Sequence, residues 1–311
     1  MIGRALTAAH LYYVQDRTMD AIAHELDTSR STVSRLLTYA RSTGIVDIRI
    51  RSPFAAPQRL EERLADRYGV TAQVVPVPDD TTEVDRLQRV AVAAGHALLE
   101  LVHDDMTIGV AWGSTTEAVS RHLVPKAVRG TTFVQLNGSG NTQTTGILYA
   151  SEILSRFAAA YEASAQQFPV PAFFDDPQTK EGMWRERSTR RILDMQASMD
   201  LVVFSTGSAG SRVPSHVYSG GYLEADELDE LSEEGVVGDI ATVFFRADGS
   251  SDGIALNDRA TGPTLELLRR VPRRLCIVSG VSKLASLRGA LEARTATDLL
   301  VDEATARALL E

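Results

Sequence analysis

Glycine combined with serine, threonine or asparagine follows several short apolar runs of this 311-residue chain. The clearest cases are Gly113-Ser114-Thr115-Thr116, Asn137-Gly138-Ser139-Gly140, Ser205-Thr206-Gly207-Ser208 and Gly280-Val281-Ser282-Lys283. Backbone amides at a helix start, with small hydroxyl side chains, suit phosphate and other anionic groups. Any single loop of this kind is equally well explained as an ordinary helix cap, so the set of four is the stronger evidence.

Two charged residues could complete such a site. Lys283 is one of only three lysines in the chain, and its ammonium is a point charge on a flexible stem, which suits phosphate. Asp239 follows Gly238 among apolar residues and could accept a hydrogen bond from a sugar hydroxyl, with loop capping as the alternative. Asp302 and Glu303 are expected to open the last helix, where negative charge favours the helix dipole.

Neutral polar residues extend the candidate site, each with an alternative. Gln135 and Asn137 end an apolar run and either bind ligand hydroxyls or satisfy their own loop backbone. Asn257 and Arg259 either complete the site or lie in a surface loop. The predicted effector-binding residues are Gly113, Ser114, Thr115, Thr116, Gln135, Asn137, Gly138, Gly207, Ser208, Asp239, Asn257, Arg259, Gly280 and Lys283.

The known catalytic and metal-binding motifs are missing from this sequence. The six histidines are scattered without metal-ligand spacing, and Gly207-Ser208-Ala209-Gly210 does not have the spacing of a nucleophile elbow. A Walker motif and a dinucleotide glycine series are also lacking. The sequence therefore predicts no catalytic residue, no metal site and no cofactor. Asp239 and Lys283 keep an enzyme open as the alternative, as base and electrophile.

The elements expected to position these loops alternate between short strands and amphipathic helices. Strands are predicted at 70–77, 107–111, 132–136, 201–204, 275–279 and 298–301, with helices at 84–101 and 117–123 among those between them. This alternation is typical of a doubly wound parallel sheet. Ligands bind such sheets beyond the carboxyl ends of the strands, so the loops should converge on one crevice.

The first fifty residues have a different pattern. Helices are predicted at 4–15, from 19 to 26 after a Thr18 cap, and after Ser29 or Thr28. The last of these presents small hydroxyls and arginines, which suit the major groove of DNA. Residues 45–51 alternate apolar and polar side chains like the strand of a wing. The alternative is a plain three-helix bundle. The predicted DNA-binding residues are Thr28, Ser29, Arg30, Ser31, Thr32, Ser34 and Arg35.

Charge and composition support two domains. Residues 1–52 hold seven arginines against five acidic residues, whereas the whole chain has a net charge of −9. The prolines at 53 and 57 favour a linker, so we expect a DNA-binding domain at 1–52 and an effector-binding and oligomerisation domain at 53–311. With one cysteine and no long apolar run, the chain is expected in the cytoplasm, without a membrane partner.

Four segments carry a resemblance to a known family. They are Gly109-Val110-Ala111-Trp112-Gly113-Ser114-Thr115, Val134-Gln135-Leu136-Asn137-Gly138, Gly235-Val236-Val237-Gly238-Asp239-Ile240 and residues 298–306. With the helix-turn-helix, they make the chain similar to the SorC family of bacterial sugar-responsive transcriptional regulators. The resemblance implies a winged helix-turn-helix followed by a Rossmann-like, NagB/RpiA-type effector domain. It also implies a sugar or sugar-phosphate effector, and dimers or tetramers on operator DNA.

The expected function is therefore regulation of carbohydrate metabolism rather than catalysis. A sugar, polyol or sugar phosphate would shift the spacing of two recognition helices, and operator affinity would change with it. A sugar-phosphate isomerase-like enzyme with a regulatory head is the first alternative. A helix-turn-helix that serves only protein assembly is the second.

Overall fold

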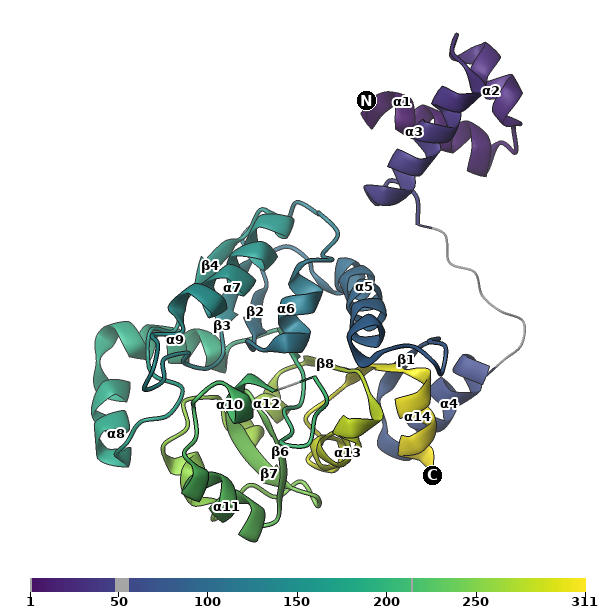
Figure 1. The fold of residues 1–311 in the computed structure, drawn as a ribbon. Helices are drawn as coiled ribbons and strands as arrows, with labels where there is room; N and C mark the ends of the chain where they lie inside the picture. The colour runs from purple at the N-terminus through teal and green to yellow at the C-terminus, as the bar shows by residue number, and fades with distance from the viewer. Residues whose placement is uncertain (1, 48–55, 214) are drawn as a thin grey trace. The chain divides into compact units, whose positions relative to one another are not determined.

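The computed structural model describes residues 2–47, 56–213 and 215–311. The chain divides into two compact units, Met1–Ala55 and Ala56–Glu311 (Figure 1). None of the helices in the described residues is long and apolar enough to cross a bilayer.

Unit 1 is built from three helices, as the apolar spacing predicts. They are α1 (Ile2–Ala9), which continues into the π-helical turn η1 (His10–Val14), α2 (Met19–Glu25) and α3 (Arg30–Ser42). Thr18 caps α2 and Ser29 caps α3, each side chain accepting a hydrogen bond from a backbone amide of the first turn. The core between them contains Ala5, Ala8, Leu11, Ile22, Val33, Leu36, Leu37 and Ala40.

The wing predicted at 45–51 falls largely outside the described residues. Residues 45–47 are described and form no strand. The helix-turn-helix itself, α2 and α3, lies fully within the described part.

Unit 2 contains the predicted parallel sheet, so the α/β fold class is confirmed. Its strand order is β1-β9-β8-β5-β2-β3-β4, and every neighbouring pair is parallel. The bounds are β1 (Thr71–Val75), β2 (Thr107–Val110), β3 (Thr132–Gln135), β4 (Ser164–Gln166), β5 (Leu201–Phe204), β8 (Arg273–Val278) and β9 (Asp298–Asp302).

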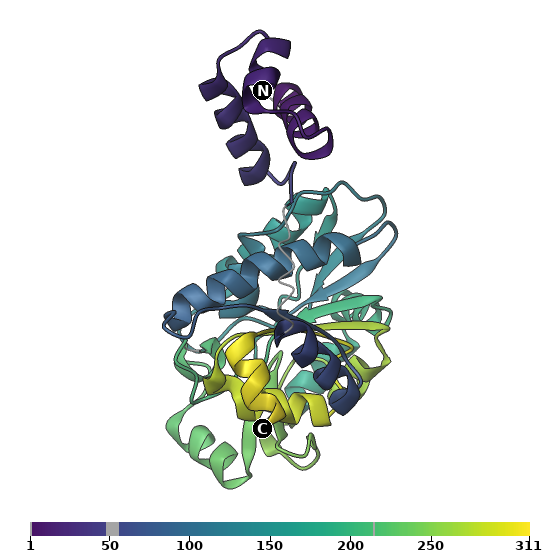
Figure 2. The same ribbon diagram turned by 90° about the vertical axis from the view of Figure 1, so that its right-hand side faces the viewer.

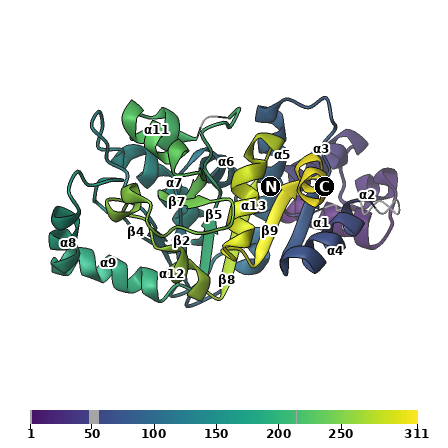
Figure 3. The ribbon, with the colours of Figure 1, turned by 90° about the horizontal axis from the view of Figure 1, so that it is seen from below.

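Helices cover both faces of this sheet, and each face has its own apolar core. The helices α5 (Glu83–Leu101), α6 (Ser114–Ser120) and α7 (Ile147–Tyr161) contribute to one core. The opposite core receives α4 (Ala56–Tyr68), α9 (Arg187–Ala197), α12 (Leu265–Arg270), α13 (Leu284–Glu292) and α14 (Glu303–Leu310). Figure 2 and Figure 3 show the same layers from the side and from below.

A separate two-stranded hairpin was not predicted. It consists of β6 (Val236–Ile240) and β7 (Val243–Arg246), which pair antiparallel. Its turn residues Ala241 and Thr242 have φ values of 47° and 71°, in the left-handed region that glycine or asparagine usually occupies. Neither alanine nor threonine is typical of such a turn, so the sequence pattern does not predict the hairpin.

A helix or helical turn starts directly after two of the four glycine-containing loops. After β2 and β8, α6 and the turn η3 (Val281–Lys283) follow at once. After β3 the next helix is α7, and after β5 it is the four-residue α10 (His216–Ser219). The chain first crosses the end of the sheet in both cases, where Gly140 bridges to Pro171 and Gly207 bridges to Asp239. The helices α8 (Pro177–Arg185) and α11 (Ala225–Glu233) complete the unit.

Candidate functional site

A cleft opens beyond the carboxyl ends of β2, β3 and β5, where a doubly wound sheet is expected to bind its ligand. The loop that opens α6 forms one wall, and the loop after β5 with the start of α10 forms another. The β6–β7 turn and Lys283 close the floor. The lining residues are Ala111, Trp112, Gly113, Ser114, Thr115, Thr116, Asn137, Ser205, Thr206, Gly207, Ser215, His216, Val217, Asp239, Ala241, Thr242 and Lys283.

Residues predicted from five distant parts of the chain meet in this cleft. They are Gly113, Ser114, Thr115, Thr116, Asn137, Gly207, Asp239 and Lys283. The Gly207 backbone and the Asp239 backbone exchange hydrogen bonds of 2.8 and 3.3 Å, which ties the loop after β5 to the hairpin. A Cβ atom at Gly207 would lie 1.9 Å from Asp239 Oδ1, so only glycine allows this approach.

Three further predicted residues border the cleft without lining it. Gln135 donates to the carbonyl of Asn137 at 2.7 Å and accepts from the Phe168 amide at 3.3 Å, so it satisfies loop backbone, which was its alternative role. Gly138 is a packing glycine, because a Cβ there would lie 2.1 Å from the carbonyl oxygen of Pro171. Ser208 is buried beside Gly207 but does not reach the cleft.

Asn257 and Arg259, which the sequence predicted either to complete the site or to lie in a surface loop, do not line this cleft. Asn257 accepts from the Phe244 amide at 2.8 Å and donates to the Phe244 carbonyl at 2.9 Å, so it holds strand β7. Arg259 forms an ion pair with Glu227 of α11 and lines a different hollow. Gly280 also lies outside the lining, although it directly precedes the turn that carries Lys283.

The floor of the cleft holds two buried charges of opposite sign. Burial lowers the pKa of Lys283 to about 8, against the opposing effect of the Asp239 carboxylate. Burial raises the pKa of Asp239 to about 6, against the opposing effects of the Thr242 amide, Lys283 and Tyr218. The Lys283 ammonium is 3.5 Å from Thr115 Oγ1, and Asp239 Oδ2 accepts from the Thr242 amide at 3.1 Å.

Three polar atoms in the cleft are buried without a hydrogen bond of normal geometry to any described residue. They are Asn137 Oδ1, Ser205 Oγ and Asp239 Oδ1. Buried polar atoms are nearly always satisfied, so a cluster of exceptions needs an explanation. Asn137 Oδ1 and the carboxylate oxygen of Asp239 can only accept hydrogen bonds, and ligand hydroxyl groups would donate them.

Aromatic residues that the sequence reasoning missed form one side of the cleft. Trp112 donates to the carbonyl oxygens of Asn137 and Gly138 at 3.2 and 2.9 Å and stacks on Tyr222 at 5.1 Å. The ring centroids of His216 and Tyr149 lie 4.7 Å apart, and burial lowers the pKa of His216 against the opposing effect of Glu117. Trp112 stands beside Gly113 in sequence and could have been found there, whereas nothing near His216 marks it.

Seven further lining residues are not among the predicted effector-binding residues; they directly follow β2 or β5, lie at the start of α10, or form the β6–β7 turn. They are Ala111, Ser205, Thr206, Ser215, Val217, Ala241 and Thr242. Within the described residues, no three His, Cys, Asp or Glu side chains are grouped so that they could hold a metal ion.

In unit 1 the predicted DNA-binding residues lie at the start of α3. Ser29, Arg30, Ser31, Ser34 and Arg35 are exposed, and Thr28 and Thr32 are half-buried. The Ser29 hydroxyl is occupied by capping, because it is 3.2 Å from the Thr32 amide and 2.9 Å from Thr32 Oγ1. Arg30 lies 3.9 Å from Asp20 of α2 in a solvent-exposed pair, which leaves its guanidinium accessible.

Comparisons with known proteins agree with both units. Residues 52–311 match the family model described as "Putative sugar-binding domain". The chain is 35% identical over 309 residues to the deoxyribonucleoside regulator of Bacillus subtilis (strain 168), an alignment that covers 98% of this chain and 96% of the relative.

Two solved structures are similar in fold over most of the chain. A domain of a "possible sugar-binding transcriptional regulator" from Arthrobacter aurescens TC1 is 54% identical, with a TM-score of 0.78, and covers 84% of this chain and 100% of that one. The full-length sorbitol operon regulator SorC from Klebsiella pneumoniae is 26% identical, with a TM-score of 0.74, and covers 100% of this chain and 99% of that one.

Proposed function

This chain belongs to the SorC family of sugar-binding transcriptional regulators, and on that premise we propose how its two units divide the work. Unit 1 binds operator DNA through α3, and the cleft of unit 2 binds a sugar, polyol or sugar phosphate that controls that binding. The protein is a transcriptional regulator under effector control; the residues named for each task are our proposal.

The observation that carries the effector site is a cluster of buried polar atoms without a hydrogen bond of normal geometry, in the same cleft as a buried cation. The atoms are Asn137 Oδ1, Ser205 Oγ and Asp239 Oδ1, and the Lys283 ammonium lies near them, beside Thr115. In our proposal the sugar hydroxyls bind the three oxygens, and an anionic end such as phosphate binds between Lys283 and the Gly113–Thr116 loop.

The names of relatives suggest where to search for the effector. One relative is called a deoxyribonucleoside regulator and another a sorbitol operon regulator. Pentoses, deoxypentoses, hexitols and their phosphates are therefore the first compounds to test.

Operator recognition is proposed to use a homodimer or tetramer in the cytoplasm. A recognition helix reads one half-site, and two half-sites about one helical turn apart require two copies of α3. Arg30 and Arg35 would reach phosphates or guanine edges, and the small hydroxyl side chains would let α3 approach the groove.

An isomerase-like enzyme is the second candidate, supported by one observation. Asp239 and Lys283 have pKa values of about 6 and about 8, close to the neutral range in which general acids and bases work. We favour the regulator because the relatives bear regulators' names and the helix-turn-helix has exposed arginines at the required place.

The test is thermal unfolding of the full chain with each compound of the panel, since a ligand that binds only the folded state raises the midpoint. We expect a sugar phosphate to raise it more than the parent sugar. That compound should change the electrophoretic mobility of the operator complex and remain chemically unchanged after prolonged incubation. Turnover would favour the enzyme, and no shift with any compound would contradict the assigned cleft.

A further inference from the structure

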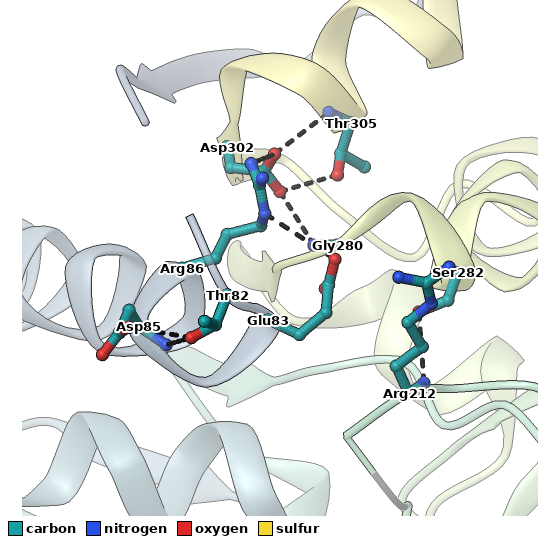
Figure 4. A network of polar contacts seen from close by, with 9 residues as sticks. All are labelled: Thr82, Glu83, Asp85, Arg86, Arg212, Gly280, Ser282, Asp302 and Thr305. Carbon is teal, nitrogen blue, oxygen red and sulfur yellow. Dashed lines mark hydrogen bonds and ion pairs between the residues drawn. The ribbon is translucent and has the colours of Figure 1, made fainter. Parts of the chain in front are cut away.

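Asp302 is the residue at which three separate segments meet. Asp302 is the last residue of β9, is 0% exposed, and accepts hydrogen bonds with both carboxylate oxygens (Figure 4). Oδ1 accepts from Arg86 Nη1 at 3.0 Å and from the Thr305 amide at 3.1 Å. Oδ2 accepts from the Gly280 amide at 2.8 Å and from the Thr305 hydroxyl at 2.6 Å. One carboxylate thus joins α5, the loop after β8 and the start of α14.

Helix capping explains only part of this arrangement. The two bonds from Thr305 cap α14, as the sequence predicted for Asp302. The bonds from Gly280 and Arg86 add nothing to the cap, and they tie the buried carboxylate to two further segments of the chain. A second role is needed to account for them.

Arg86 supplies the balancing charge from the first turns of α5. Its side chain is 7% exposed, and its Nε lies 3.8 Å from Glu83 Oε1 as well. Burying an ion pair costs desolvation, and apolar residues of similar volume are often as stabilising or more so. What an ion pair adds is a fixed geometry, because its hydrogen bonds hold in only one arrangement.

Gly280 connects the Asp302 carboxylate to the turn that carries Lys283 in the cleft. Its φ is +94°, and a Cβ there would lie 2.2 Å from Glu83 Oε2. Its carbonyl accepts from the Lys283 amide at 3.1 Å, and the Ser286 hydroxyl donates to the Lys283 carbonyl at 2.9 Å. The backbone of Lys283 is therefore fixed through Gly280, and its side chain is 6% exposed in the cleft.

We propose that Arg86 and Asp302 are positioning residues of the effector site. They hold the Gly280–Lys283 turn so that the Lys283 ammonium lies beside Thr115 and Asp239. The consequence for effector affinity rests on the proposed function, whereas the placement of Lys283 can be tested without any ligand.

The first measurement follows Lys283 directly in the ligand-free, full-length protein. Because the chain has three lysines, 13C-labelled lysine gives few side-chain NMR signals, and Lys283→Arg identifies the one that belongs to Lys283. In the wild type it should titrate near 8. In Arg86→Met and Asp302→Asn the titration should move toward the usual 10.5, because a released turn exposes the ammonium to water. Arg86→Lys, which keeps the charge, should stay closer to the wild type.

A matched control exists at the opposite end of the same two strands. Asp298 begins β9 and forms an ion pair with Arg273 of β8 at 2.6 Å. Asp298→Asn should destabilise the protein without moving the Lys283 titration. An equal shift in this control would mean general loosening of the sheet and would overturn the proposal.

The second measurement is the Kd of the sugar phosphate selected by the thermal panel. Arg86→Met and Asp302→Asn should raise it on the order of tenfold, as loss of an orienting residue typically does, with the Kd of Asp298→Asn unchanged.

An unchanged Lys283 titration in Arg86→Met and Asp302→Asn refutes the positioning role, whatever the effect on ligand binding. If the wild type binds no compound of the panel, the proposed function is refuted, but the Lys283 titration still tests whether Arg86 and Asp302 position Lys283. If Asp302→Asn does not fold, the Lys283 titration in Arg86→Met and Arg86→Lys tests the positioning role instead.

Discussion

At the residue scale, the pair of Lys283 and Asp239 predicts how effector binding depends on pH. Lys283 has a pKa of about 8 and Asp239 of about 6, so both are charged only between these values. Because burial lowers the pKa of Lys283, the ammonium loses its proton near pH 8 instead of 10.5, and affinity for an anionic effector should fall above pH 8. The fall reaches at most about tenfold per pH unit.

Below about pH 6 the affinity should fall as well, since protonated Asp239 accepts ligand hydroxyls less well. Calorimetric titrations at constant ionic strength measure both limbs, whose apparent pKa values belong to the coupled pair. Lys283→Gln should flatten the upper limb. Below about pH 6 the affinity falls for two reasons, protonation of Asp239 and protonation of the ligand phosphate, whose second pKa is about 6. Asp239→Asn should remove the first contribution and leave the second. A wild-type profile that stays level up to pH 10 would contradict the role of Lys283.

Also at this scale, Asn257 and Arg259 show the limit of residue types as evidence. Both are polar and follow a glycine-containing segment, as the true lining residues do. In the structure Asn257 bonds to the backbone of Phe244 and Arg259 pairs with Glu227, and neither residue lines the cleft. These partners are distant in sequence, so the residue types alone did not predict them.

At the scale of elements, α3 predicts the effect of removing its exposed arginines. Arg30→Ala and Arg35→Ala should each weaken operator binding by about 1–3 kcal/mol if the guanidinium contacts a base edge. A phosphate contact would instead weaken binding to all sequences and reduce the salt dependence by about one ion. Gel shifts at several salt concentrations distinguish the two.

The control for this prediction is an exposed arginine of unit 2. Arg270 of α12 forms a solvent-exposed pair with Glu266, so Arg270→Ala should leave operator binding unchanged. Both α3 variants should keep wild-type effector affinity. Normal operator binding by both of them would remove α3 as the recognition helix.

The strands and helices also differ in how well the sequence anticipated them. The apolar runs that became β2, β5, β8 and β9 were predicted within a few residues, because a buried parallel strand reads as a short continuous apolar segment. The loops after β3 and β5 do not enter helices at once but first form the bridges Gly140–Pro171 and Gly207–Asp239. Ser205 lines the cleft directly after β5, and the longer segment that follows brings His216 to it.

At the scale of the whole molecule, the division into units predicts separable activities. A chain of residues 56–311 should fold and bind the effector as the full chain does, because a similar domain 54% identical to this one forms crystals by itself. It should show no affinity for operator DNA, since α3 is absent. Calorimetry and gel shifts on this fragment measure both, and specific operator binding by the fragment would refute the division of tasks.

The sequence by itself determined the features that depend on local pattern. Helical spacing and the caps Thr18 and Ser29 define α2 and α3, and apolar runs followed by glycine define the carboxyl edge of the sheet. These signals are local because backbone preference and burial of one face act over a few residues.

Only the tertiary structure decided which polar residues face the cleft. Asp239 and Thr242 reach it through an unannounced hairpin, His216 reaches it through a crossing loop, and Asp302 serves Gly280 and Arg86 as well as its own helix. These positions depend on packing between segments that are distant in sequence. The burial that shifts the pKa values of Lys283 and Asp239 exists only once those segments have met.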